Sequence, residues 1–357
     1  MSATDALAGE STPTLPMDDE RRRRGRQRRV LGLLLTGLLI GVVVALKTGA
    51  VPITWSALLG AEGDAKALLE RTVFIEIRSP RVLLAAFVGA ALGLAGAVLQ
   101  GLFRNPLADP QLIGVSSGAA LGAVAMIVLG EAIAWPLWFA HYAVPASAIT
   151  GGVLVTAFLY LFSRYFGNFN TVTMILVGIA INALAVVGVG AFEYLSDDTQ
   201  LRTLVFWMMG SFGRATWPTI IPSLLVISLG AAVLLRLGDR FDLLQLGEEG
   251  ARHLGVDTRH LTRIAILASA AVVGAGVAVS GIISFLGLVV PHLVRLLGGP
   301  SHRYVLPASA LLGALMMVMA DLLARTLVVP AELPVGLVTS AIGGPFFLWL
   351  IARVRMR

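Results

Sequence analysis

The sequence contains no cysteine, and the only lysines among its 357 residues are Lys47 and Lys66. Without cysteine, the chain can form no disulfide, thiolate metal site or cysteine nucleophile. Neither lysine stands in the G-x-x-x-x-G-K-[ST] pattern of a phosphate-binding loop, so the sequence carries no Walker A motif. We therefore expect that this chain alone does not hydrolyse ATP.

Charged residues are also scarce. Asp, Glu, Lys and Arg make up 13% of the chain, compared with roughly 25% in soluble domains, whereas hydrophobic residues make up 57%. Runs without any of these charged residues cover residues 82–103, 110–130, 165–192, 215–235, 264–291 and 333–352. Because about 20 apolar helical residues cross a hydrocarbon core, these runs predict an all-α polytopic membrane protein.

The N-terminal region is polar and then strongly basic. Residues 1–20 carry Ser, Thr, Pro and acids, and the run RRRRGRQRR at 21–29 precedes an apolar stretch at 30–46. A signal peptide is the alternative, but the polar leader is long, the apolar stretch exceeds a usual signal core, and no A-x-A cleavage site follows. We expect a disordered basic cytoplasmic segment at 1–29, a transmembrane domain at 30–352 that keeps its first helix, and a basic cytoplasmic C-terminus at 353–357.

The apolar pattern predicts ten transmembrane helices. They are placed at residues 30–47, 81–103, 111–130, 143–163, 171–193, 216–236, 262–284, 287–298, 304–324 and 333–352. Ten spans put both termini on one side, and 19 of the 27 Lys and Arg residues then fall in segments on that side. By the positive-inside rule that side is the cytoplasm. The apolar stretch 201–212 is too short to span and is expected to be re-entrant or interfacial.

Small residues recur at helical spacing in several predicted helices. Examples are Gly89, Gly93 and Gly96 in one helix and Gly118 and Gly122 in another. Such residues let helix backbones approach closely, and we expect them to serve packing within one bundle rather than a dimer contact. A weak repeat also relates 88–114 to 273–299, with 7 identities over 27 positions. Because the two matched helices would run in opposite directions, this pattern suggests the inverted repeat found in many transporters.

Two polar loops interrupt the apolar pattern on the predicted cytoplasmic side. The loop 236–263 contains short amphipathic stretches broken by glycine, with the apolar positions Leu243, Leu246, Ala251 and Leu254 and the breaks Gly247 and Gly255. Apolar faces without an evident partner favour a docking surface, with a surface-lying connector as the alternative. The loop 104–110 holds two prolines, which restrict Asn105 and Asp109 to extended conformations, and a rigid hairpin is its alternative explanation.

The ionisable residues within the apolar part show no catalytic constellation. No histidines are paired as H-x-x-x-H or H-E, so no metal site is expected. Asp321 and Arg325, four residues apart near a helix end, are expected to pair. Arg78, Arg81 and Arg325 lie at predicted outer helix ends, where snorkelling anchors are the usual explanation. The pI of about 10.3 is explained by membrane topology, and no nucleic-acid partner is expected.

Four ordered motifs carry a resemblance that covers about residues 30–352. They are RSPRVLLAAFVGAALGLAGAVLQGLFRNPLADPQLIGVSSGAALG at 78–122, GEEGARHLGVD at 247–257, GIISFLGLVVPHLVRLLG at 281–298, and ADLLART with AELPVGLVTSAIGGPFFLWLI within 320–351. In these motifs the chain resembles the FecCD-type permeases. These are the membrane subunits of bacterial ABC importers for iron-siderophores, haem and cobalamin.

The resemblance implies a type II ABC importer permease fold in the bacterial inner membrane, with both termini cytoplasmic. It implies a homodimer that pairs with two ATPase subunits, which carry ATP and Mg, and that receives substrate from a periplasmic binding protein. The chain itself is then not an enzyme and binds no cofactor.

The resemblance also implies roles for individual residues. The docking residues for the binding protein would be Arg78, Arg81 and Arg325. The ATPase-coupling residues, within 240–257, would be Leu243, Leu246, Gly247, Glu248, Ala251, Leu254 and Gly255. The cytoplasmic gate would be formed by Asn105, Leu107, Asn170 and Thr171.

Within the family, the motifs at 107–124 and 196–217 look most like those of the haem permeases, except that Gln111 stands where those usually carry Gly. Haem is therefore the expected cargo, with a ferric siderophore or cobalamin as the alternative. Pathway residues would be Asn182, Thr339 and Ser340, although Asn182 could equally hydrogen-bond a neighbouring helix. An ion-coupled secondary transporter is less favoured, because the predicted helix centres hold almost no carboxylates for a relay. An intramembrane enzyme is disfavoured in the same way, since no Ser/His or paired-Asp constellation is visible.

Overall fold

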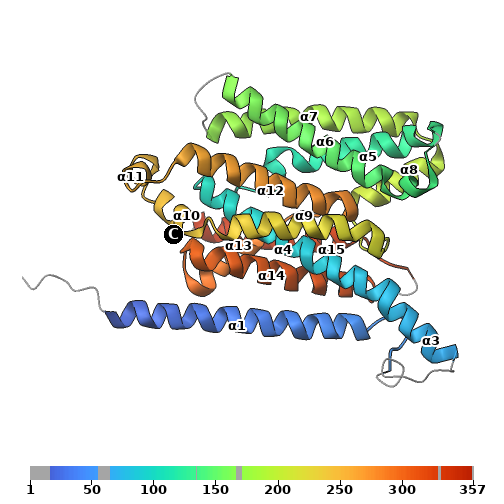
Figure 1. The fold of residues 1–357 in the computed structure, drawn as a ribbon, viewed down its shortest axis with the longest axis horizontal. Coiled ribbons are helices and arrows are strands. Elements are labelled where there is room, and N and C mark those ends of the chain that lie inside the picture. The colour runs from blue at the N-terminus through green and yellow to red at the C-terminus, as the bar shows by residue number, and fades with distance from the viewer. Residues whose placement is uncertain (1–16, 55–64, 134, 166–170, 329–330, 356–357) are drawn as a thin grey trace, which may run out of the picture.

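The computed structural model describes residues 17–54, 65–133, 135–165, 171–328 and 331–355. Within these ranges the chain is built of helices and turns and contains no strand, which confirms the all-α class. The long helices lie side by side along one direction and form a bundle (Figure 1). The α-helices are α1 (Met17–Lys47), α3 (Ala65–Thr72), α4 (Ser79–Leu102), α5 (Val115–Leu129), α6 (Leu137–Tyr165), α7 (Thr171–Leu195), α8 (Asp198–Met208), α9 (Trp217–Leu235), α10 (Gly238–Leu244), α11 (Glu248–His253), α12 (Thr258–Ser280), α13 (Leu286–Gly298), α14 (His302–Ala324) and α15 (Val335–Arg355).

Seven helical stretches within the described residues are long and apolar enough to cross a bilayer. They are Glu20–Lys47, Ala65–Leu102, Phe139–Phe162, Leu176–Leu195, Trp217–Leu235, Thr258–Ser280 and His302–Ala324. Three shorter apolar helices accompany them, at Val115–Leu129, Leu286–Gly298 and Val335–Trp349. Each of the ten predicted ranges falls on one of these elements. The apolar stretch that was predicted to be too short to span contributes to the 11-residue helix α8.

The first helix is longer than predicted. Residues 1–16 lie outside the described residues, but α1 begins at Met17 and continues without a break to Lys47. The prediction of disorder is therefore wrong for residues 17–29. Arginine is a good helix former, and a helix nucleated in the apolar stretch propagates upstream at little cost because each added residue gains a hydrogen bond.

The boundary between α12 and α13 also differs from the prediction. The helix predicted at 262–284 ends at Ser280, because Gly281 has φ +71° and lies against the carbonyl of Trp207. Phe285, at φ +69°, precedes α13 as its N-cap residue. Only glycine adopts such a conformation readily while leaving no side chain toward a neighbouring backbone, so Gly281 fixes the break between the two helices.

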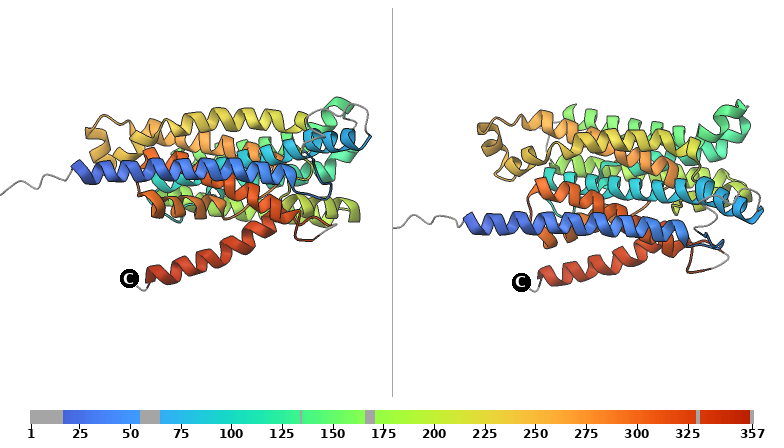
Figure 2. Two further views of the ribbon diagram at one scale, coloured as in Figure 1. Left: turned by 90° about the horizontal axis from the view of Figure 1, so that it is seen from below. Right: turned by 60° about the horizontal axis from the view of Figure 1, so that its bottom comes forward.

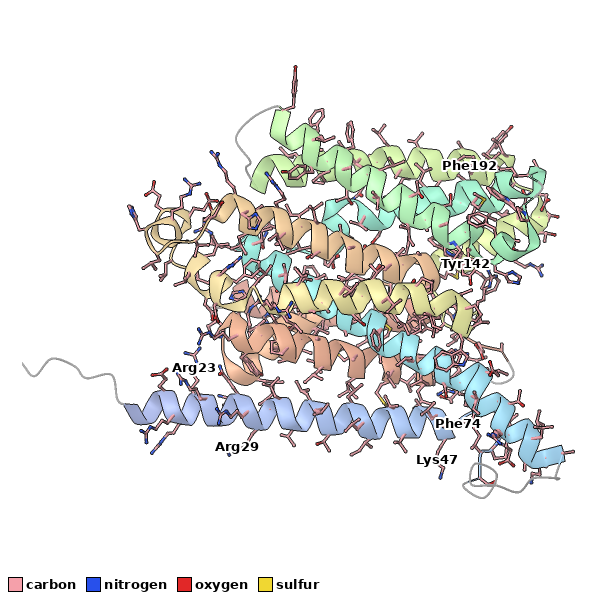
Figure 3. The ribbon with its side chains drawn as sticks, in the orientation of Figure 1. Arg23, Arg29, Lys47, Phe74, Tyr142 and Phe192 are labelled. Carbon is pink, nitrogen blue, oxygen red and sulfur yellow. The ribbon has the colours of Figure 1, made fainter. Side chains whose placement is uncertain are left out.

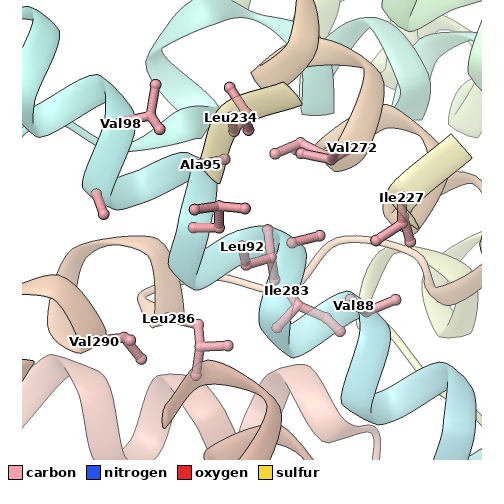
Figure 4. Close-up of a cluster of buried hydrophobic side chains, with 14 of the residues drawn as sticks. Val88, Leu92, Ala95, Val98, Ile227, Leu234, Val272, Ile283, Leu286 and Val290 are labelled. Atoms are coloured by element: carbon pink, nitrogen blue, oxygen red, sulfur yellow. The ribbon is translucent and has the colours of Figure 1, made fainter. Parts of the chain in front are cut away.

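The centre of the bundle is α4, whose side chains are buried along most of its length. Val88, Leu92, Ala95 and Val98 on this helix meet side chains from α9, α12 and α13 in one apolar cluster (Figure 4). A Cβ added at Gly89 or Gly93 would overlap backbone carbonyls of α14, and one at Gly122 would overlap α6. These glycines therefore serve close packing inside one chain, as predicted.

The bundle has two distinct ends. The start of α1, the helices α10 and α11, and the end of α15 all lie at one end (Figures 1 and 2). We call this the α10 end and the opposite end, where α4 begins, the Arg81 end. Figure 2 also shows α15 leaving the body of the bundle as it approaches the α10 end. The helices of the suspected repeat, α4 and α12, run in opposite directions (Figure 1), and the repeat itself stays a prediction.

Candidate functional site

A cluster of charged side chains lies where α4 begins and α14 ends, at the Arg81 end. Arg81 Nε donates to both carboxylate oxygens of Asp321, at 3.0 and 3.1 Å, and Arg81 Nη2 lies 2.9 Å from Asp321 Oδ1. Arg81 Nη1 donates to both oxygens of Glu332, at 3.0 and 2.8 Å. One guanidinium therefore joins an acid on α14 to an acid in the connection between α14 and α15. Charge-assisted bonds of this kind are the strongest hydrogen bonds that side chains make.

Arg325 joins the same cluster from the end of α14. Its Nε lies 3.7 Å from Asp321 Oδ2, which confirms the predicted pairing four residues apart. Its Nη2 donates to the carbonyl oxygen of Ala45 on α1. Asp321 is thus placed between two arginines, and this explains how an acid can be buried at the end of a membrane helix.

Arg78 differs from Arg81 and Arg325, because its partners are backbone carbonyl oxygens and not carboxylates. Nη1 donates to Leu46 and Lys47 at 3.0 and 2.9 Å, and Nη2 donates to Val51 at 2.5 Å. The last carbonyls of a helix have no partner within the helix and carry a partial negative charge. Arg78 therefore caps the C-terminus of α1 and ties it to α4.

A π-turn places these arginines. The turn at Val73–Arg78 joins α3 to α4, and the Ser79 N–H donates to the carbonyl of Phe74 five residues earlier. Ser79 Oγ donates to the same carbonyl at 2.7 Å. Pro80 follows at the start of α4, and it has no N–H to continue the ordinary ladder. The wider turn accommodates this proline and carries Arg78 and Arg81 toward the bundle interior.

The three predicted docking arginines are therefore buried and held by groups of their own chain. The Arg81 and Arg325 side chains are 8% and 6% exposed, and Asp321 is 1% exposed. The exposed member of the cluster is Glu332, whose side chain is 49% exposed. Snorkelling into solvent is not what these arginines do, so that alternative is wrong. Their role in docking a binding protein stays a prediction.

At the opposite end, α10 and α11 form the compact loop that was predicted to dock a partner. Leu246 and Leu254 are 67% and 57% exposed, while Ala251 is buried within the chain. Gly247 and Gly255 have φ of +99° and +84°, and the first separates α10 from α11 while the second follows α11, so both breaks lie where they were predicted. Of the predicted coupling residues, the two exposed leucines and the exposed Glu248 can therefore contact a partner, whereas Ala251 can only support them. Leu243 is partly buried and packs against the core.

Asp242 connects α10 directly to α14. Its carboxylate accepts from Ser301 Oγ at 2.8 Å and from the His302 N–H at 2.5 Å, and it lies 3.1 Å from His302 Nδ1. Partial burial by itself raises the pKa of the Asp242 carboxyl, but the hydrogen bonds from His302 and Ser301 outweigh it and hold the pKa below the usual value. A lowered aspartate pKa stabilises the fold above the usual pKa, and this contribution is lost as pH falls through the lowered value.

The predicted gate is described only in part. Asn105 Oδ1 accepts from the Leu107 N–H at 2.9 Å, which fixes the turn after α4, and Leu107 is exposed. Asn170 lies outside the described residues, and Thr171 is the first residue of α7, where only its backbone is described. The gate therefore stays a prediction.

The predicted pathway residues make contacts within the chain. Asn182 on α7 accepts a hydrogen bond from Ser117 Oγ on α5, which is the predicted alternative of a bond to a neighbouring helix. Thr339 is buried and its hydroxyl donates to the Gly336 carbonyl at 3.1 Å, while Ser340 is half-buried. A role for these three residues in a pathway stays a prediction.

Gln111, the departure from the haem-permease motif, has a structural role. Its Nε2 donates to the Ile283 carbonyl at 3.3 Å and to Ser284 Oγ at 3.1 Å. The side chain thereby ties the turn before α5 to the broken segment between α12 and α13. Across the described residues, no three His, Asp or Glu side chains gather in a way that could hold a metal ion. The expectation that the chain holds no metal or cofactor stays a prediction.

The sequence matches the model of the FecCD transport family over residues 37–353. The chain belongs to the FecCD transport family. It is 45% identical over 332 residues to the hemin transport system permease protein HmuU of Yersinia pestis, covering 93% of this chain and 98% of that protein. It is 41% identical over 290 residues to the vitamin B12 import system permease protein BtuC of Vibrio cholerae, covering 81% and 86%. A solved structure, described as an inward-facing conformation of a metal-chelate type ABC transporter, matches with a TM-score of 0.81 and 35% identity over 91% of this chain and 99% of that one.

These relatives set the class of this FecCD chain. It is a multi-pass inner-membrane permease subunit of an ABC importer of the metal-chelate, haem and B12 type. ATP hydrolysis is carried by a separate subunit of such transporters, which agrees with the missing Walker lysine. The resemblance identified from the motifs is thus confirmed.

Sequence reasoning missed two sets of contacts. Arg81 was not paired with Asp321 and Glu332, and Asp242 was not connected with His302. The only signal in the sequence was the presence of acids in an otherwise uncharged setting, because a buried charge requires a partner.

Proposed function

We propose that this chain is the membrane subunit of an ATP-driven importer that moves haem from a periplasmic binding protein into the cytoplasm. The observation that carries the proposal is the 45% identity to a hemin permease over nearly the full length of both chains. The haem-like motifs at 107–124 and 196–217 support it. Cobalamin and ferric siderophores are the alternative cargoes. The 41% identity to a vitamin B12 permease supports cobalamin as one of these alternatives.

The proposed assembly contains two copies of this chain, two ATPase subunits and one binding protein. Each copy would cross the membrane ten times, with both termini in the cytoplasm, using the seven long and three shorter apolar helices. The position of α15 supports a second copy, since this apolar helix leaves the bundle (Figure 2). It also borders a small apolar hollow of about 40 Å³, which is lined by Phe285, Leu286, Val289, Met316, Ala320, Thr339, Ile342 and Gly343. An apolar hollow beside a diverging helix is suited to side chains of a second copy.

The proposed passage is neutral and weakly binding. A wide macrocycle must not be trapped, and Asn182, Thr339 and Ser340 would offer small polar groups among apolar ones. The central residues of α7 and α15 include no His, Tyr or Cys that could ligate iron. Haem would therefore leave its ligand on the binding protein and pass without an iron–protein bond here. Asn105, Leu107, Asn170 and Thr171 would close the cytoplasmic mouth.

Transport in liposomes tests the cargo. The permease is reconstituted with its ATPase, binding protein is added, and uptake of haem, cobalamin and a ferric siderophore is compared with and without ATP. We expect ATP-dependent uptake of haem well above that of the other two. Uptake of a siderophore or of cobalamin but not of haem would overturn the cargo and leave the importer class intact.

We also propose that carboxylates of the binding protein engage the cluster of Arg78, Arg81 and Arg325. Each of these arginines already has hydrogen-bond partners in its own chain, so an incoming carboxylate must replace one of those partners. Glu332 is the exposed partner of Arg81 and is the group that can leave. Docking would then exchange one carboxylate for another without exposing Arg81 unpaired.

The variant Glu332→Gln tests this exchange, because it removes the competitor and should raise the association rate severalfold at low salt, as charge steering does. A gain in rate cannot arise from a destabilised protein, unlike the loss expected from changing a buried arginine. Glu76→Gln is the control, since it removes an exposed acid at the same end without touching Arg81. The association rate is measured with the binding protein immobilised on a sensor surface. Equal increases in the rate for the two variants would show that the change in net charge, and not the release of Arg81, speeds association.

A further inference from the structure

The polybasic start of α1 has two sides with different surroundings. Figure 3 shows Arg23 on the side of α1 that faces the bundle and Arg29 on the outer side. The rotation of the helix is fixed, because Gln27 Nε2 donates to the Gly298 carbonyl at 2.9 Å and Leu34 packs in the core. The arginines of the two sides therefore cannot exchange places without unpacking α1.

The inner side faces acids of the same chain. A cleft of about 640 Å³ lies between α1, α10 and α14, with Arg23, Arg24 and Arg28 on the α1 wall. Three acids line the same cleft, namely Glu20, Asp239 and Asp242. Arg24 pairs with Glu20, and Arg303 across the cleft pairs with Asp239.

The outer side lies outside this cleft, since its arginines are not among the residues that line it. Residues spaced four and three apart put Arg22, Arg26 and Arg29 on one stripe of the helix. All three are exposed, and no carboxylate in the described part of the chain forms an ion pair with them. Arg26 makes one long contact, of 3.5 Å, with the Leu296 carbonyl.

The same stripe continues into the membrane as an apolar surface. Leu33 follows Arg29 by four residues and Ile40 follows by eleven, and both are exposed. At a rise of about 1.5 Å per residue, Arg26 and Arg29 lie within about 6 Å of the apolar run that starts at Val30. The headgroup layer on each side of the hydrocarbon core is about 5–7 Å thick. With α1 in the bilayer, the guanidinium groups of Arg26 and Arg29 would therefore be level with lipid phosphates, directly above side chains that would face lipid tails.

We propose that Arg26 and Arg29, with Arg22 one turn farther from the hydrocarbon core, form a binding site for the headgroup of an anionic phospholipid. The guanidinium fork matches phosphate oxygens in pairs, and basic residues next to a membrane helix attract anionic lipids. The lipid chains would lie along Leu33 and Ile40. This inference goes beyond the proposed transport and requires only that α1 lies in the bilayer, so it can fail or succeed independently of the cargo.

Spin-labelled lipids in bilayers containing the full chain test the site. The association of labelled phosphatidylglycerol is compared with that of labelled phosphatidylcholine carrying the same chains. The selectivity for phosphatidylglycerol is expected to fall about tenfold in the variant Arg26→Gln/Arg29→Gln, since each basic residue at an anionic surface contributes several-fold in association. The variant Arg26→Lys/Arg29→Lys should keep most of the selectivity, and high salt should reduce it in the unchanged protein.

The control is Arg240→Gln/Arg252→Gln, which removes two exposed arginines from α10 and α11 at the same end. It should keep the selectivity of the unchanged protein. An equal loss in both glutamine variants would overturn the site in favour of net charge. Unchanged selectivity in Arg26→Gln/Arg29→Gln would overturn it outright. Complete displacement of the labelled lipid by millimolar inorganic phosphate would show a site for free phosphate instead of lipid.

Discussion

The variant Asp321→Asn is expected to lower the free energy of unfolding by about 3–5 kcal/mol, the usual cost of removing one partner from a buried ion pair. Asp321 is 1% exposed and lies between Arg81 and Arg325. Its replacement leaves two buried guanidinium groups without their shared carboxylate, and Glu332 remains paired with Arg81. The effect is measured by titration with a denaturing detergent, with the helical circular dichroism signal as the readout of unfolding.

Two comparisons separate the charge effect from a general loss of packing. Glu332→Gln removes the half-exposed acid of the same cluster and should cost at most about 1 kcal/mol, as exposed pairs do. The double variant Arg81→Gln/Asp321→Asn removes both charges of the pair and should be more stable than Asp321→Asn alone. If Asp321→Asn is no less stable than Glu332→Gln, the cluster does not stabilise the fold in this way.

The contacts of Asp321 and Asp242 give α14 a special position in the bundle. At one end, Asp242 on α10 caps the helix through Ser301 and His302. At the other end, Arg81 on α4 holds Asp321. A helix of 23 residues spans about 35 Å, close to the thickness of the hydrocarbon core. α14 is therefore a single helix that runs from the surface proposed for the ATPase to the surface proposed for the binding protein. A carboxylate fixes each of its ends by charge-assisted hydrogen bonds.

The helices could be predicted from the sequence because an apolar run of membrane length has few alternatives. Apart from the upstream extension of α1, the observed helices differ from the predicted ranges by at most six residues at either end. The break at Gly281 was missed because the residues around it are as apolar as the helices, and only the close approach to Trp207 shows why the helix must stop there. The packing role of Gly89 and Gly93 was predictable because small residues have few other uses inside a membrane bundle.

The charged cluster was predictable only where its members are neighbours in sequence. Asp321 and Arg325 are four residues apart on one helix, so helical spacing alone brings them together. Arg81 and Asp321 are 240 positions apart, and their contact depends on how α4 packs against α14. The sequence therefore suggested arginines at a surface, whereas the fold turns them toward acids of the same chain.

The variants Leu246→Asp and Leu254→Asp are expected to reduce substrate-stimulated ATP hydrolysis by the assembled transporter at least tenfold. This expectation rests on the proposed docking of the ATPase at α10 and α11. Both leucines are more than half exposed, so in the isolated chain a new carboxylate there is solvated and the fold is unaffected. In the assembly the same carboxylate would be buried against the partner without a counter-charge, which costs several kcal/mol. Co-purification of the two subunits and the ATPase rate of the complex measure the result.

His253→Asp is the matched control. His253 is the exposed last residue of α11, next to Leu254, so the change adds a carboxylate at almost the same place without removing an apolar side chain. It should change ATPase activity much less than Leu254→Asp does. Ala251→Gly tests the supporting role of the buried alanine and should affect stability more than binding, since its side chain touches only its own chain. Full activity and full co-purification of both leucine variants would mean that the ATPase docks elsewhere. Equal losses in Leu254→Asp and His253→Asp would instead show that added charge, and not the apolar contact, is what the partner rejects.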